Sequence, residues 1–419
     1  ILWQLADICE KLKNQTESKD ALRGRVFHQV KNLLTVATDY AFDKNLWHNY
    51  LTFLLITNEN PFSLVCEKMG AQDGTVNNFV THDFAMFIKL FDYDFSWMEK
   101  ELSIDCFTQL THYKAIRKKE LMYNKNVSEK VRNLSEQLET AESGADFFKY
   151  VTEFYKDFGV GMFGLNKAFR IAENGDGSVR FLPINNMDAV MLDDLIGYEL
   201  QKKKLVENTQ AFCDGKAANN VLLFGDSGTG KSTSIKAIVN QFYPQGLRMI
   251  EIYKHQFKDL STIIAQIKNR NYKFIIYMDD LSFEEFEIEY KFLKAVIEGG
   301  VETKPDNVLI YATSNRRHLI KETWKDREDM EHSEDLHRSD TMEEKLSLVN
   351  RFGLSIYYAK PNKEGFNEMA IALARRAGIT PDIMTDEEIC YEANRFEMRG
   401  GGLSGRTAQQ FANYLLTIK

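Results

Sequence analysis

One short pattern constrains the fold of this chain more than any other feature. Residues 225–232 read Gly-Asp-Ser-Gly-Thr-Gly-Lys-Ser, which matches G-x-x-x-x-G-K-[ST]. The apolar run Val221–Phe224 precedes the pattern, and the helix-like segment Ser234–Phe242 follows it. A strand, a glycine-rich loop and a helix in this order bind phosphate, because the loop amides and the helix N-terminus attract an anion. The pattern therefore predicts an α/β domain that binds the phosphates of a nucleotide.

Each residue type in this loop has an expected role. Lys231 is expected to reach the β- and γ-phosphates, and the Ser232 hydroxyl is expected to bind Mg²⁺. The other predicted nucleotide contacts of the loop are Gly225, Asp226, Ser227, Gly228, Thr229, Gly230 and Thr233. ATP and Mg²⁺ are therefore the predicted ligands.

A second motif lies downstream, where the apolar run Phe274–Met278 ends in two carboxylates. In nucleotide hydrolases with such a loop, a carboxylate after a neighbouring strand helps to hold the metal ion. We expect Asp279 to hold Mg²⁺ through water and Asp280 to orient or deprotonate the attacking water. Because the Asp280 side chain is short, Glu284 remains an alternative base.

The rest of the C-terminal part alternates between strand-like and helix-like segments, which predicts a doubly wound parallel α/β sheet. The apolar runs that predict its strands are 221–224, 247–252, 274–278, 308–311 and 354–358. Upstream of them, Asn174–Gly177 separates two short alternating runs and predicts a β-hairpin.

The N-terminal part is predicted to be helical. Only one of the six prolines, Pro61, lies before residue 183, and the apolar residues of Val127–Ala141 recur every three or four positions. From about Asn362 onward the pattern is helical again. The predicted domains are an N-terminal mainly helical domain (1–165), a hairpin and linker (166–190), an α/β nucleotide-binding domain (191–360) and a helical lid (361–419).

Taken in order, these motifs resemble those of the AAA+ ATPases. Ile196, Gly197 and Tyr198 look like the adenine-side motif of that class. Asn315, at the end of the strand that begins at Val308, looks like sensor 1, a polar side chain between the carboxylates and the γ-phosphate. The resemblance implies that these residues contact the nucleotide or its reacting phosphate.

The same resemblance implies roles for two arginines. Arg351 looks like the arginine finger, which in this class enters the site of a neighbouring subunit, and Arg406 looks like sensor 2 on the lid. Arg316 and Arg317 compete with Arg351 for the role in the neighbouring site. The resemblance implies a homo-oligomer, in the form of a ring or spiral of about six subunits.

A closer resemblance is to the bacterial ATP-binding family known as domain of unknown function 815, over about residues 160 to 419. The segments that carry it are 196–201, 219–223, 279–284, 311–319 and 344–347.

The composition limits the classes of partner that are expected. Lys and Arg number 53 against 61 Asp and Glu, for a net charge of −8, whereas a protein that binds nucleic acid is more often basic. The five cysteines are scattered without a CxxC pair, which favours a reducing cytoplasm. No apolar run approaches the roughly 18 residues that cross a bilayer, so no membrane partner is expected.

The sequence therefore predicts a magnesium-dependent ATP hydrolase whose site lies at a subunit interface and which remodels or loads a protein partner. One alternative is a nucleic-acid-directed motor or helicase loader, because Asp279 and Asp280 together resemble the pair in replication-initiator ATPases. The other alternative is a nucleotide-gated switch that hydrolyses ATP slowly.

Overall fold

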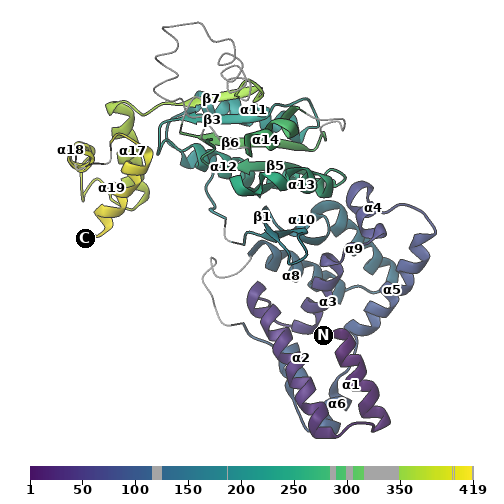
Figure 1. The fold of residues 1–419 in the computed structure, drawn as a ribbon. Coiled ribbons are helices and arrows are strands. Elements are labelled where there is room, and N and C mark those ends of the chain that lie inside the picture. The colour runs from purple at the N-terminus through teal and green to yellow at the C-terminus, as the bar shows by residue number, and fades with distance from the viewer. Residues whose placement is uncertain are drawn as a thin grey trace. The chain divides into compact units, whose positions relative to one another are not determined.

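The computed structural model of the chain has two compact units, Ile1–Asn166 and Lys167–Lys419 (Figure 1). The residues it describes are 1–115, 125–185, 187–283, 289–298, 305–315, 349–398, 400 and 402–417. Within these ranges, no helix combines the length and the apolar character that crossing a membrane requires.

The first unit is built from helices. They are α1 (Leu2–Asn14), α2 (Lys19–Tyr40), α3 (Leu46–Thr57), α4 (Pro61–Met69), α5 (Val76–Phe91), α6 (Ser96–Leu102), α7 (Cys106–Thr111), α8 (Lys125–Glu139), α9 (Gly144–Phe158) and α10 (Gly161–Leu165).

Local sequence signals explain where these helices begin and which face they bury. At α4, the Asn60 side chain accepts from the Ser63 amide, Ser63 caps the Asn60 amide in return, and Pro61 occupies the first turn. The predicted apolar stripe of α8 is buried at each of its positions within the helix, Val127, Val131, Leu134 and Leu138. Helix α3 is buried along most of its length and packs against α2, α5, α7 and α8.

The second unit contains a seven-stranded sheet in the order β2-β1-β4-β5-β6-β3-β7. The strands are β1 (Ala168–Glu173), β2 (Val179–Pro183), β3 (Val221–Gly225), β4 (Leu247–Glu251), β5 (Lys273–Met278), β6 (Val308–Ser314) and β7 (Leu354–Tyr358). The five strands predicted as parallel, β3 to β7, pair in parallel.

The hairpin has a different place from the one that the sequence indicates. Strands β1 and β2 pair antiparallel, as predicted, but β1 also pairs in parallel with β4, from Ala168 opposite Met249. The hairpin therefore forms the edge of the sheet, where β1 pairs with backbone groups of β4 that would otherwise be unpaired.

Helices cover both faces of the sheet (Figure 1). The remaining elements of the core are η2 (Leu192–Asp194), α11 (Glu199–Cys213), α12 (Lys231–Phe242), η3 (Tyr243–Gln245), η4 (Lys254–Asp259), α13 (Leu260–Ile267) and α14 (Glu289–Glu298). Apolar residues of α11 and α12 share one core with alternate residues of the strands, such as Val221 and Leu223. Successive residues of β3, β4, β5 and β6 are buried, as expected for a sheet enclosed by helices on both sides.

Three helices follow the last strand and form a small bundle with its own core. They are α17 (Lys363–Arg376), α18 (Asp386–Glu397) and α19 (Gly405–Thr417). Phe366 of α17, Ile389 of α18 and Phe411 of α19 are buried against one another in this core. The predicted fold class is confirmed: a doubly wound parallel sheet with an N-terminal helical unit and a C-terminal helical lid.

Candidate nucleotide-binding site

The glycine-rich loop connects β3 to α12 at the carboxyl edge of the sheet. Gly225 has φ +132°, and a Cβ there would lie 2.2 Å from the Tyr358 carbonyl oxygen of β7. At Gly228, with φ +76°, a Cβ would lie 3.0 Å from Ser404 Oγ. Gly225 needs glycine because a side chain would collide with β7, and Gly228 favours glycine because its φ is left-handed and the lid is close. The resulting turn leads directly into the N-terminus of α12, where anions are favoured.

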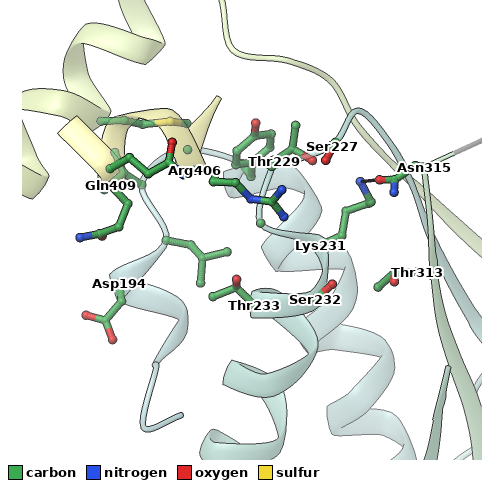
Figure 2. A pocket seen from close by; sticks show the side chains of 18 of the residues that line it. Asp194, Ser227, Thr229, Lys231, Ser232, Thr233, Thr313, Asn315, Arg406 and Gln409 are labelled. Carbon is green, nitrogen blue, oxygen red and sulfur yellow. Dashed lines mark hydrogen bonds between the residues drawn. The ribbon is translucent and has the colours of Figure 1, made fainter. Parts of the chain in front are cut away.

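Lys231 is held beneath this loop, with only 6% of the residue exposed. Its Nζ donates to the carbonyl oxygens of Gly225 at 3.0 Å and Asp226 at 2.6 Å, and to Asn315 Oδ1 at 3.0 Å. Figure 2 shows the contact with Asn315. Burial lowers the pKa of Lys231, while the charges of Asp226, Asp280 and Asp279 oppose that shift. The ammonium is thus fixed where several acceptors converge.

Asp279 follows the end of β5 and is exposed to the cavity. Its Oδ1 accepts from Ser232 Oγ at 2.7 Å and from Thr313 Oγ1 at 2.6 Å. Burial alone would raise the pKa of Asp279, but the hydrogen bonds from Thr313 and Ser232 outweigh it, so the pKa is lowered. The carboxylate is therefore ionised and faces the first turn of α12.

Asp280 has the left-handed φ of +50°, uncommon for a residue other than glycine. Its amide donates to Thr313 Oγ1 at 2.9 Å, and its Oδ1 accepts from Asn315 Nδ2 at 2.7 Å. These two bonds direct the Asp280 carboxylate toward Asn315. Asn315 therefore lies between Lys231 and Asp280 and contacts both.

The lid contacts the loop directly. The Arg406 amide, at the start of α19, donates to the Gly228 carbonyl oxygen at 3.2 Å. Figure 2 shows the Arg406 guanidinium pointing from the lid toward the loop. A second attachment comes from α17, where Arg376 donates to the carbonyl oxygens of Asp194 at 2.8 Å and Asp193 at 2.7 Å.

These groups surround one cavity of about 590 Å³, which is within the usual size range for small-molecule sites. Its wall includes apolar and aromatic residues, namely Leu195, Ile196, Tyr198, Met369 and Leu373, beside the polar residues of the loop. Apolar and polar lining residues in one cavity fit a ligand that has both an apolar and a polar part, as a nucleotide has a base and phosphates.

Most of the predicted site residues line this cavity. They are Ile196, Tyr198, Ser227, Gly228, Thr229, Gly230, Lys231, Ser232, Thr233, Asp279, Asp280, Asn315 and Arg406. Gly197, with φ +78°, lies between two of them. Gly225 and Asp226 line a neighbouring cavity of about 620 Å³, together with Asn315.

Arg351 is not among the residues that line this cavity. It precedes β7, whose first residue Leu354 pairs with Val221, whereas the loop begins at Gly225, opposite Tyr358. The intervening strand measures about 13 Å at ~3.3 Å per residue, so Arg351 is at the opposite edge of the sheet from the cavity of its own chain. The alternatives Arg316, Arg317 and Glu284 lie outside the described residues.

Sequence reasoning missed several residues of the cavity. Thr313 is the most consequential, because its hydroxyl bonds both to Asp279 and to the Asp280 amide. Its position two residues before Asn315, on the same face of β6, is a signal that could have found it. The other missed lining residues are Asp194, Leu195, Met369, Leu373, Gly405, Gln409 and Gln410.

Comparison with known proteins places the chain in a family. The model of the family described as "Protein of unknown function (DUF815)" matches residues 165–418. The chain belongs to this family. The DUF815 match covers the whole of the unit that carries the cavity apart from its last residue, and it confirms the resemblance that the motifs predict.

No curated protein matches the chain. Among solved structures, a variant of RuvB from Thermotoga maritima is similar, with 15% sequence identity and a TM-score of 0.34. That similarity covers 54% of this chain and 71% of the RuvB chain.

We expect the Thr313 hydroxyl to stabilise the carboxylate pair measurably. Thr313→Val removes it at nearly constant volume, so Asp279 loses a hydrogen bond and the Asp280 amide loses its acceptor. The free energy of unfolding should fall by about 1–3 kcal/mol. Hydrogen exchange of the β5 and β6 amides measures this within the second unit. Thr313→Ser keeps the hydroxyl and should stay within about 1 kcal/mol of the parent; equal losses in both variants would contradict the assignment.

Proposed function

We propose that this DUF815 protein is an ATPase that hydrolyses the γ-phosphate of ATP with Mg²⁺. The observation that carries the proposal is the convergence of Lys231, Asn315 and Asp280, linked by hydrogen bonds, at the glycine-rich loop. A phosphate-binding loop alone supports binding. A cation, an amide and a carboxylate arranged in sequence beside it support attack on the terminal phosphate.

The residues present fit a magnesium ion. Mg²⁺ prefers oxygen ligands, and it is usually held by one or two protein groups together with substrate phosphates and water. Ser232 Oγ and Asp279 Oδ1 lie 2.7 Å apart at the first turn of α12 and are the two groups that would hold it. Among the described residues there is no cluster of three or more acidic, His or Cys side chains that could bind a metal without substrate. When bound, the ion neutralises negative charge on the phosphates.

The nucleotide would lie along the cavity. The loop amides and Lys231 would bind the β- and γ-phosphates, Arg406 would reach them from the lid, and Ile196, Gly197 and Tyr198 would flank the base. Because Arg406 also bonds to the loop through its amide, the lid and the phosphates would be linked through one residue.

Asp280 would act on the attacking water. Its carboxylate would accept the proton as the water oxygen bonds to the γ-phosphorus and the bond to the bridging oxygen breaks, which yields ADP and phosphate. Asn315 would hold the carboxylate in place, and Lys231 with Arg406 would offset the charge on the transferring group. Positioning and electrostatics would therefore supply most of the catalysis.

Asp280→Asn tests the hydrolytic step. The amide cannot accept a proton, so ATP affinity should stay near the parent value while turnover falls by at least about a hundredfold. Calorimetry measures the ATP affinity, and the rate of phosphate release measures the turnover. Asp188→Asn is the control, because Asp188 is an exposed carboxylate that pairs with Lys236 outside the cavity. This variant should leave ATP affinity and turnover unchanged. If Asp280→Asn turns over normally, Glu284 becomes the preferred base.

We further propose that the working unit is a homo-oligomer, in which Arg351 of one copy completes the site of the next. The support is the position of Arg351 at the edge of the sheet opposite to its own cavity. An arginine there is far from its own site, whereas a ring or spiral would bring it to a neighbour's site. A count of about six is proposed by class resemblance.

Mixing two inactive variants tests the shared site. Arg351→Ala should bind ATP normally and lose on the order of a thousandfold in turnover, since an arginine finger acts on the transition state. When mixed with Asp280→Asn subunits, some sites pair an intact Asp280 with an intact neighbouring Arg351, so activity should partly return. Native mass measurement establishes that mixed assemblies form. Background activity in such assemblies would rule out the shared site.

We propose that the protein uses ATP hydrolysis to remodel or load a protein client. The net charge of −8 disfavours a nucleic acid as the partner. The first unit exposes apolar side chains on α5, among them Val76, Phe79 and Met86, which supports contact with a protein. The five cysteines are all free, which supports a cytoplasmic location.

A further inference from the structure

A buried tyrosine lies beside the proposed magnesium ligands. Tyr277 is the last residue but one of β5, and only 1% of it is exposed. Its hydroxyl is enclosed and makes no hydrogen bond with any of the residues that the structure describes. A buried hydroxyl without a partner is unfavourable relative to a paired one. Phenylalanine would fill the same space without that penalty.

The surroundings of the hydroxyl are specific. Tyr277 and Asp279 are two residues apart at the end of β5, so their side chains are directed to the same side of the sheet. The polar side chains that interact with the hydroxyl are Ser232, Asp279 and Thr313, the three residues joined by the hydrogen bonds of the metal end. The unpartnered donor therefore lies beside the residues that are proposed to hold the metal ion.

Two other buried tyrosines of the same core have hydroxyls that form hydrogen bonds with other side chains. Tyr311 lies opposite Tyr277 on β6, and its hydroxyl is 2.8 Å from Thr209 Oγ1 and accepts from Asn208 at 3.1 Å. The Tyr358 hydroxyl of β7 donates to Ser234 Oγ at 3.0 Å. Both of these hydroxyls are satisfied within the fold, and neither is next to Asp279.

We propose that Tyr277 is a positioning residue for the magnesium end of the site. Its hydroxyl donates a hydrogen bond to the Asp279 carboxylate when Mg²⁺ and ATP are bound, and so fixes the direction of that carboxylate. The inference rests on the proposed ATPase function and deepens it. Carboxylates that hold a metal ion are commonly oriented by such a hydrogen bond, and removing the donor weakens metal affinity by about 10- to 100-fold.

Tyr277→Phe tests this, because it removes one oxygen and leaves the ring. The affinity for fluorescently labelled ATP is measured in EDTA and across a series of Mg²⁺ concentrations. We expect the Mg²⁺ concentration that gives half of the gain in affinity to rise about tenfold. The affinity in EDTA should stay at the parent value, and the thermal unfolding midpoint should not fall, since an unpaired buried hydroxyl is removed and no hydrogen bond of the fold is lost.

Tyr311→Phe is the matched control. It removes a hydroxyl from the paired position on the next strand, so it should lower the unfolding midpoint while leaving the Mg²⁺ dependence at the parent value. An unchanged Mg²⁺ dependence in Tyr277→Phe would overturn the inference, and so would equal shifts in both variants. A parent protein that binds ATP without any response to Mg²⁺ would overturn the proposed function together with this inference. A normal response in the parent and in Tyr277→Phe would overturn the inference alone.

Discussion

A closed ring of hydrogen bonds at the carboxyl edge of the sheet is the feature on which the site depends. Lys231 donates to Asn315, Asn315 donates to Asp280, and the Asp280 amide donates to Thr313. Thr313 then donates to Asp279, which also accepts from Ser232, the residue that follows Lys231 in the chain. The ring joins α12 to the ends of β5 and β6. It holds two adjacent carboxylates near a buried ammonium, so that charge and hydrogen bonding offset the unfavourable burial of Lys231.

The parallel register explains why these residues meet. Because β3, β5 and β6 run in the same direction, their carboxyl ends lie at one edge, where the loop, the carboxylates and Asn315 all emerge. The lid then closes the remaining side and is held at two points, the Gly228 carbonyl and the backbone of Asp193 and Asp194. A change in either attachment would alter the width of the cavity. In the proposed function, nucleotide binding would therefore be coupled to the position of the lid.

Features encoded within a short stretch of sequence could be predicted. The loop pattern, the apolar runs of β3 to β7 and the stripe of α8 each follow from local spacing, and the structure has them at the predicted places. Pairings between distant segments could not be predicted. The attachment of the hairpin to β4, the contact of Thr313 with both carboxylates and the left-handed Asp280 depend on tertiary register, which no local pattern specifies. The Tyr277 hydroxyl was missed for the same reason, because in the sequence it is one more member of an apolar run.

The central claim is that the ring of hydrogen bonds around Lys231 serves ATP hydrolysis. Phosphate release from ATP by the purified full chain, measured with Mg²⁺ and with EDTA, tests it most directly. The account predicts release that requires Mg²⁺ and that Lys231→Ala abolishes, because this variant removes the counter-charge to the β- and γ-phosphates. Release that persists in EDTA or in Lys231→Ala, or ATP affinity that is unaffected by that substitution, would contradict it.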